Sequence, residues 1–176
     1  MRQFVIVAVL LPLFGMSLPA SEQESRALSR ARASTVANVV KFTVWPSAKV
    51  GREAALRLCV LEADHVADAF DALPATALGN WEQPVRRMTT NEQPIGCDLL
   101  YLGDIDGGRA KMMLSGIRLF PVLTVGGSEA MSQAGAIAAV FPVGEGMRIA
   151  VNPAAARQAN LHLSSRLMAL TTVVRP

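Results

Sequence analysis

Short apolar runs alternate with helical segments along most of the chain, and this alternation constrains the fold more than any other feature. Runs of strand length cover residues 56–61, 85–89, 98–102 and 121–125. Apolar residues three or four positions apart, the spacing of a helix face, mark residues 22–42, 62–73 and 108–117, and a short helix ends at residue 133. Strands interleaved with helices predict an α/β sandwich with a mainly parallel sheet.

The pattern changes in the last forty or so residues. Two apolar runs, 136–143 and 147–152, flank Gly144-Glu145-Gly146, which predicts an antiparallel hairpin with a three-residue loop. Asn152-Pro153 is a typical helix start. A final helix is expected over 163–174, with Ser164 as its cap. The prediction is one αβ domain with a mainly parallel sheet of about six strands, a closing hairpin and helices on both faces.

The first twenty residues have the layout of a secretory signal peptide. Arg2 precedes an eleven-residue, largely apolar run from Phe4 to Phe14, and small or turn-forming residues follow. The run is shorter than the roughly 20 residues that cross a bilayer. We therefore expect cleavage near Ala20, export to the periplasm, a mature domain over 21–176 and no membrane insertion after cleavage. No cysteine stands at the cleavage site, so a lipid anchor is not expected.

Two cysteines, Cys59 and Cys97, are the only ones in the chain. In an oxidising compartment an isolated pair is more often bridged than free. Their separation is far from the Cys-x-x-Cys spacing of an exchange site. Closing a loop of this length stabilises a fold by about 4 kcal/mol in the chain-entropy model.

Patterns that carry catalysis are missing from the sequence. The two histidines, His65 and His162, have no set of metal-ligating neighbours, and no nucleophile elbow or Walker A motif occurs. No catalytic residue, metal or cofactor is therefore predicted. The formal charge is only +3 and the basic residues are scattered, so nucleic acid is not an expected partner. Gly107-Gly108 and Gly126-Gly127 follow strands and precede helices, where such turns can hold an anion or simply reverse the chain.

Several local strings occur in an order that matches one known family. The first helix ends in Phe42-Thr43-Val44-Trp45-Pro46, like the family's Phe-x-x-Trp-Pro signature. The strings around both cysteines, over 56–61 and 97–103, also match. So do residues 121–125 and the closing run 152–170, and together the matches span nearly all of the mature chain. In this order of strings the chain resembles the YfiR family of diguanylate-cyclase repressors.

The resemblance implies a periplasmic repressor without enzymatic activity of its own. Such a protein would bind the periplasmic domain of a YfiN-like inner-membrane diguanylate cyclase. A YfiB-like, OmpA-like outer-membrane lipoprotein would sequester it, raising cyclic-di-GMP and promoting biofilm formation. Cys59 and Cys97 would form the family's structural disulfide and make the system redox-dependent. A homodimer is also implied.

The predicted partner surface comprises Trp45, Ala156, Arg157, Leu161 and Leu163. Ala154-Ala155-Ala156 leaves room for close approach of a partner, although the same alanines also suit packing on the sheet. Trp45 would anchor an interface if exposed and would pack on the sheet if buried. The alternative function is a periplasmic small-molecule-binding or sensing module, because mainly parallel sheets offer crevices at their strand ends.

Overall fold

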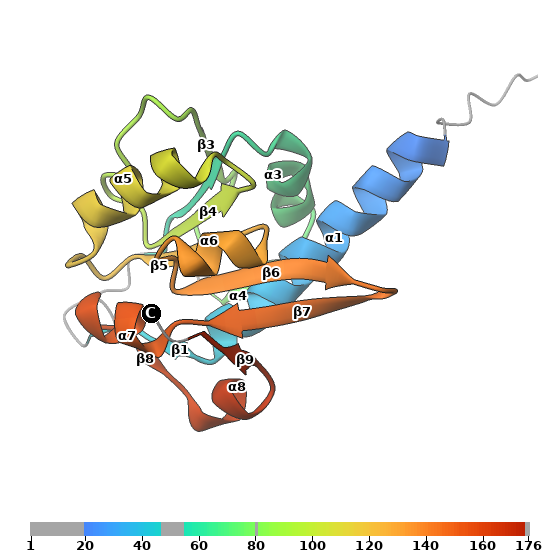
Figure 1. The fold of residues 1–176 in the computed structure, drawn as a ribbon. Coiled ribbons are helices and arrows are strands. Elements are labelled where there is room, and N and C mark those ends of the chain that lie inside the picture. The colour runs from blue at the N-terminus through green and yellow to red at the C-terminus, as the bar shows by residue number, and fades with distance from the viewer. Residues whose placement is uncertain (1–19, 47–54, 80, 175–176) are drawn as a thin grey trace, which may run out of the picture.

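A seven-stranded mixed sheet runs through the protein and carries helices on both faces (Figure 1). The computed structural model describes residues 20–46, 55–79 and 81–174. The predicted signal peptide, apart from Ala20, lies outside these residues. The strand order is β3-β2-β4-β5-β6-β7-β9, and every neighbouring pair is parallel except β6 and β7. The predicted α/β fold class is confirmed, with one strand more than the six expected.

The strands of this sheet are β2 (Leu58–Leu61), β3 (Arg86–Met88), β4 (Leu99–Gly103), β5 (Leu123–Gly126), β6 (Ala138–Val143), β7 (Gly146–Val151) and β9 (Thr172–Val173). A separate antiparallel pair joins β1 (Thr43–Val44) to β8 (His162–Leu163). The helices are α1 (Ala20–Lys41), α3 (Asp64–Asp71), α4 (Ala75–Leu78), α5 (Gly107–Ile117), α6 (Glu129–Gln133), α7 (Pro153–Gln158) and α8 (Ser165–Ala169).

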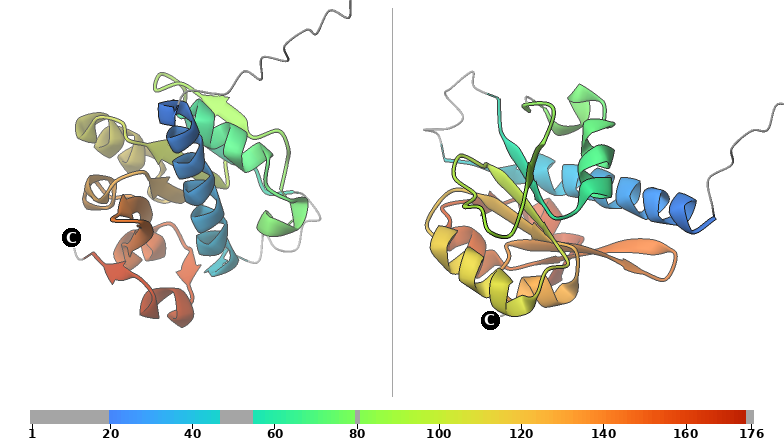
Figure 2. Two further views of the ribbon diagram at one scale, coloured as in Figure 1. Left: turned by 90° about the vertical axis from the view of Figure 1, so that its right-hand side faces the viewer. Right: turned by 90° about the horizontal axis from the view of Figure 1, so that it is seen from above.

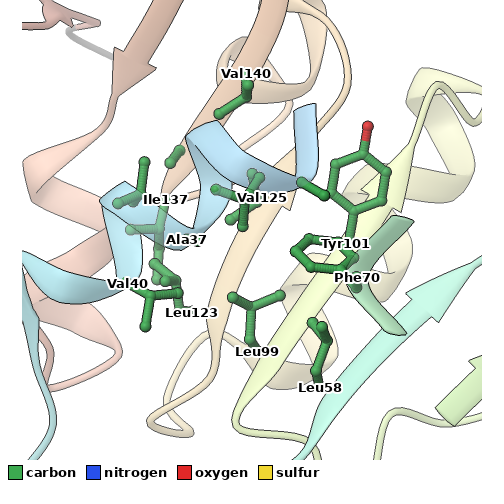
Figure 3. Packing of buried hydrophobic residues seen from close by; sticks show 14 of the residues in the cluster. Ala37, Val40, Leu58, Phe70, Leu99, Tyr101, Leu123, Val125, Ile137 and Val140 are labelled. Atoms are coloured by element: carbon green, nitrogen blue, oxygen red, sulfur yellow. The ribbon is translucent and has the colours of Figure 1, made fainter. Parts of the chain in front are cut away.

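One face of the sheet is covered by α1 and α3, which Figure 2 shows together on the side opposite α5 and α6. Residues of α1 at helical spacing, Val36, Ala37 and Val40 among them, pack on alternate residues of the strands. Leu99 and Tyr101 of β4 point to this face, as Figure 3 shows. The long first helix is therefore held by its apolar stripe.

The other face is a second, smaller core under α5 and α6. Cys59 and Leu61 of β2 and Leu100 and Leu102 of β4 point to it, because successive side chains of a strand alternate between faces. Leu114 of α5 packs against them. The two cysteines lie in this core, so the covalent link and the packing of α5 share one environment.

The closing hairpin is present, but its loop is shorter than predicted. Val143 pairs with Gly146, so only Gly144 and Glu145 form the turn, and Gly144 has a positive φ of 60°. Beyond Ala139, β6 has no register partner on β5, and the hairpin projects from the sheet (Figure 1). Pro142 lies on this projecting part, where a missing N–H costs no ladder bond.

The predicted final helix over 163–174 is wrong in extent. Ser164 does cap a helix by accepting from the Leu167 amide, but α8 ends at Ala169. Residues 171–174 are the β-branched run Thr-Thr-Val-Val, which favours a strand, and Thr172 and Val173 add β9 beside β7. Within the described ranges, no helix combines the length and the apolar character that a bilayer crossing demands.

Candidate functional site

The structure places most of the predicted partner-binding residues in the core. Trp45, Ala156, Leu161 and Leu163 are buried in the cluster between α1 and the sheet, and Arg157 is exposed. The β1–β8 pairing sets Thr43 opposite Leu163, which joins the segments that carry Trp45 and Leu161. In this conformation the four buried side chains do not offer a contact surface, so an interface has to be sought elsewhere.

The two cysteines form a disulfide that ties β2 to the segment leading into β4. Their Cα atoms are 5.9 Å apart, and both side chains are buried. The Sγ of Cys97 lies 3.8 Å from the Sδ of Met88 on β3, so three neighbouring chain segments meet around the bond. The bridge closes a loop spanning 38 positions, which includes the whole of α3 and β3.

Arg57 and Gly96 hold the segment before Cys97 in place. The Arg57 guanidinium donates to Glu82 Oε2 at 2.9 Å and to the Gly96 carbonyl at 3.4 Å. The hydrogen bond that Arg57 donates to Glu82 lowers the pKa of the Glu82 carboxyl and raises the pKa of Arg57. Gly96 has a φ of +80°, and a Cβ there would lie 2.7 Å from an Arg57 nitrogen, so the position favours glycine.

An apolar groove of about 470 Å³ opens directly beside the disulfide. Its walls include Pro94, Ile95, Cys97, Ile117, Phe120 and Val122, and we call it the disulfide-side groove. Ile95 is 78% exposed and Phe120 is 60% exposed, and Leu119 beside it is 70% exposed. Arg86 donates to the Ile95 carbonyl at 3.0 Å and Arg57 donates to the Gly96 carbonyl, so two arginines hold the loop that carries Ile95. Large exposed apolar side chains around a groove are typical of an interaction site.

The α5 helix, whose carboxyl end forms one wall of the groove, is basic. Residues 107–121 carry Arg109, Lys111 and Arg118, all exposed, and contain no acidic residue. Sequence reasoning missed the groove because Ile95 and Phe120 stand in connecting segments, outside any periodic apolar pattern. Only their exposure in the folded chain identifies them.

A second, polar crevice lies at the carboxyl ends of β2 and β4. The chain leaves β2 for β3 on one side and then returns to form β4 on the other side, so the strand order reverses here. Ligands of open α/β sheets bind outside such reversal points. The crevice, about 460 Å³, is lined by Arg32, Glu62, Thr90, Asp104, Asp106 and Arg109, and we call it the switch-point crevice.

Two of its carboxylates are already engaged by the protein. Glu62, at a positive φ of 45°, accepts from the Thr90 hydroxyl at 2.8 Å and from the Thr90 amide at 3.1 Å, and these bonds lower its pKa. Asp106 caps α5 by accepting from the amides of Gly108 and Arg109 at 3.0 and 3.1 Å. Arg109 also donates to the Thr90 hydroxyl at 3.2 Å.

Arg32, on α1, is the most enclosed charged residue of the crevice. Its side chain is 16% exposed and reaches Asp104 Oδ2 at 3.4 Å and the Gly127 carbonyl at 3.3 Å, both at the long end of hydrogen-bond distances. A Cβ on Gly127 would lie 2.9 Å from Asp104, so this glycine allows the close approach. Across the described residues, no three His, Cys, Asp or Glu side chains are grouped to hold a metal ion.

Together, the fold and these two sites define a class: a single-domain α/β protein whose β2 strand is tied to the segment before β4 by one buried disulfide. Within that class, the chain belongs to the YfiR/HmsC-like family, whose model matches residues 29–172. The resemblance seen in the sequence is thereby confirmed. Members of this family act as regulators rather than enzymes and are associated with diguanylate-cyclase signalling in the periplasm.

A solved structure has a similar fold. It is a conserved domain protein from Vibrio cholerae O1 biovar El Tor strain N16961, with a TM-score of 0.61 and 12% sequence identity. The similarity covers 82% of this chain and 60% of that protein's chain. At this identity the likeness concerns the fold alone. No curated protein sequence matches the chain.

Proposed function

We propose that the protein is a periplasmic negative regulator that binds and represses a YfiN-like inner-membrane diguanylate cyclase. In this proposal a YfiB-like outer-membrane lipoprotein sequesters it, and the balance controls cyclic-di-GMP and biofilm formation. Export would follow from the signal peptide cleaved near Ala20. Family membership supports the class of regulator, and the disulfide-side groove is the observation that carries partner binding.

The groove provides the energy that such a regulator needs. A repressor shifts a cyclase only by binding one conformation better than another. Covering an exposed Ile or Phe side chain contributes about 2 kcal/mol relative to leaving it in water. Ile95 and Phe120 together therefore offer enough to anchor an interface.

The disulfide links this surface to the redox state of the compartment. Cys97 lines the groove, and the neighbouring Gly96 is held by Arg57. With the bridge intact, the loop bearing Ile95 is fixed to β2. Reduction would release that tether and remove about 4 kcal/mol of loop-closure stabilisation. A regulator with this design binds in the oxidised state and loses affinity when reduced.

Substitutions in the groove test the proposed interface. The double variant Ile95→Asp with Phe120→Asp is expected to weaken binding of the cyclase periplasmic domain at least tenfold, measured by co-purification and by cyclic-di-GMP output. Leu170→Asp is the matched control, because Leu170 is 77% exposed and lies outside the groove. Full repression by the groove variant would exclude the groove. Failure of the wild-type protein to recover any membrane diguanylate cyclase would exclude the function itself.

Redox dependence is tested with the double variant Cys59→Ser, Cys97→Ser, and with the wild-type protein reduced by dithiothreitol. We expect a lower melting temperature and reduced capture of the same cyclase domain. Capture that is unchanged while the thiols are shown to be free would refute redox dependence. Light scattering of the purified protein tests the homodimer, which we propose from the family alone.

A further inference from the structure

We propose that the switch-point crevice is a binding site for a small zwitterionic molecule, with its anionic group held by Arg32 and Arg109 and its cationic group held by Asp104. The site is separate from the disulfide-side groove, because it lies at the amino end of α5 and the groove lies at the carboxyl end. The ligand site proposed here and the partner-binding groove can therefore be tested independently.

The position of the crevice supports a ligand site. It lies outside the carboxyl ends of β2 and β4, where the strand order reverses and two loops diverge. Its volume of about 460 Å³ is within the range of small-molecule pockets. Glu62, Asp104 and Asp106 come from the loops that follow the two strands, and Arg32 reaches the crevice from α1.

Arg32 has unused hydrogen-bonding capacity in the crevice. In the part of the chain that the structure describes, Arg32 Nε is buried without a hydrogen-bond partner. Tyr101 is fully buried on β4, and its hydroxyl points away from the apolar cluster in Figure 3. Burial raises the pKa of Tyr101 and a hydrogen bond with Arg32 lowers it, so the hydroxyl is next to Arg32, which lines the crevice. A buried donor without a partner costs about 1–3 kcal/mol, which a ligand can recover.

The charges of the lining select the class of ligand. A purely anionic molecule would meet Asp104, whose side chain is 50% exposed and whose contact with Arg32 is long at 3.4 Å. A purely cationic molecule would meet Arg32 and Arg109. Because Glu62 and Asp106 are engaged by Thr90 and the α5 amides, Asp104 is the carboxylate best placed to receive a cation. A molecule carrying both charges satisfies both sides of the crevice.

Matched probes test this class directly. Isothermal titration of the mature protein would use four zwitterions: glycine, β-alanine, γ-aminobutyrate and 6-aminohexanoate. Each is compared with two singly charged molecules of the same chain length, one a carboxylate and one an amine. We expect at least one zwitterion to bind ten times more tightly than either counterpart. Amide resonances of Gly103, Gly107 and Gly127 should shift on its addition, and those of Gly144 at the hairpin tip should not.

Two variants assign the charges. Asp104→Asn and Arg109→Gln should each weaken binding of that zwitterion about tenfold, and Arg118→Gln, at the other end of α5, should leave it unchanged. The proposal is overturned if no zwitterion binds below 10 mM, if a singly charged probe binds equally well, or if Asp104→Asn and Arg109→Gln bind like the wild type.

Discussion

Tyr101 is the chain's only tyrosine, so its ionisation can be followed without interference from another phenol. Burial raises its pKa from 10.0 to about 12, and Asp104 adds to the rise while Arg32 opposes it. We predict that tyrosinate absorbance near 295 nm titrates with a midpoint near 12 in the native protein and near 10 in guanidinium chloride.

The same residue sets an alkaline limit to stability. The unfolded state loses the phenolic proton near pH 10 and the folded state near pH 12, so the stabilisation is complete below pH 10 and is lost as the pH rises toward 12. Tyr101→Phe should remove this component from urea unfolding curves measured across that range. A native midpoint close to 10 would show that the phenol is not buried.

At the residue scale, features set by local chemistry were predictable from the sequence. The sequence predicts Asn152 and Ser164 as helix caps, because capping depends on nearby residues alone. In the structure each side chain accepts from the amide three residues further on. The sequence leaves Trp45 open between a surface anchor and a packed side chain and assigns Leu163 to the partner surface, because nothing local reveals the β1–β8 pairing. Their burial depends on a contact between segments more than a hundred positions apart.

At the scale of elements, α8 and β9 show where periodicity misleads. Leu163, Leu167 and Leu170 have helical spacing, which predicted one continuous helix with all three on its buried face. In the structure the helix is five residues long, Leu167 is 2% exposed and Leu170 is 77% exposed. The spacing of the apolar residues therefore predicts too long a helix, because the β-branched residues that follow α8 join the sheet instead.

These two leucines give a matched pair of substitutions. Leu167→Ala should lower the free energy of unfolding by about 2–5 kcal/mol, since it removes a fully packed side chain from the core between α1 and the sheet. Leu170→Ala should change it by about 0.5 kcal/mol or less. Urea denaturation of both variants measures the difference. Equal effects would mean that Leu170 also packs in solution and that the helix extends as the sequence predicts.

At the scale of the whole molecule, the fold class was predictable and the sites were not. Alternating strands and helices define an α/β sheet without reference to strand order. The switch-point crevice exists only because β4 returns beside β2, and the disulfide-side groove only because α5 ends beside the Cys97 loop. Both depend on long-range neighbours, which one sequence does not display.

Three solvent-accessible glutamates near β3 accept hydrogen bonds that bear on stability in acid. Arg57 bonds Glu82 and Arg86 bonds Glu92, while Glu62 bonds Thr90. Hydrogen bonds lower the pKa of each of these three glutamates. The donor is Arg57 for Glu82, mainly Thr89 for Glu92, and Thr90 for Glu62. The folded protein therefore keeps them ionised at a pH where the unfolded chain has already bound protons.

Because the unfolded state then binds more protons, stability is complete above the ordinary glutamate value of 4.5 and falls as the pH drops through the lowered folded values. We predict that the urea midpoint declines steadily below pH 4.5 and that Glu82→Gln makes this decline shallower. Glu145→Gln, at the hairpin tip, is the control for removing one carboxylate elsewhere on the surface. Since Glu82 anchors Arg57, which also holds Gly96 beside the disulfide, the same variant should loosen the groove at neutral pH. If the urea midpoint of Glu82→Gln fell with pH as steeply as that of the wild type, the Arg57–Glu82 pair would not form in solution. The acid response would then be unrelated to the groove.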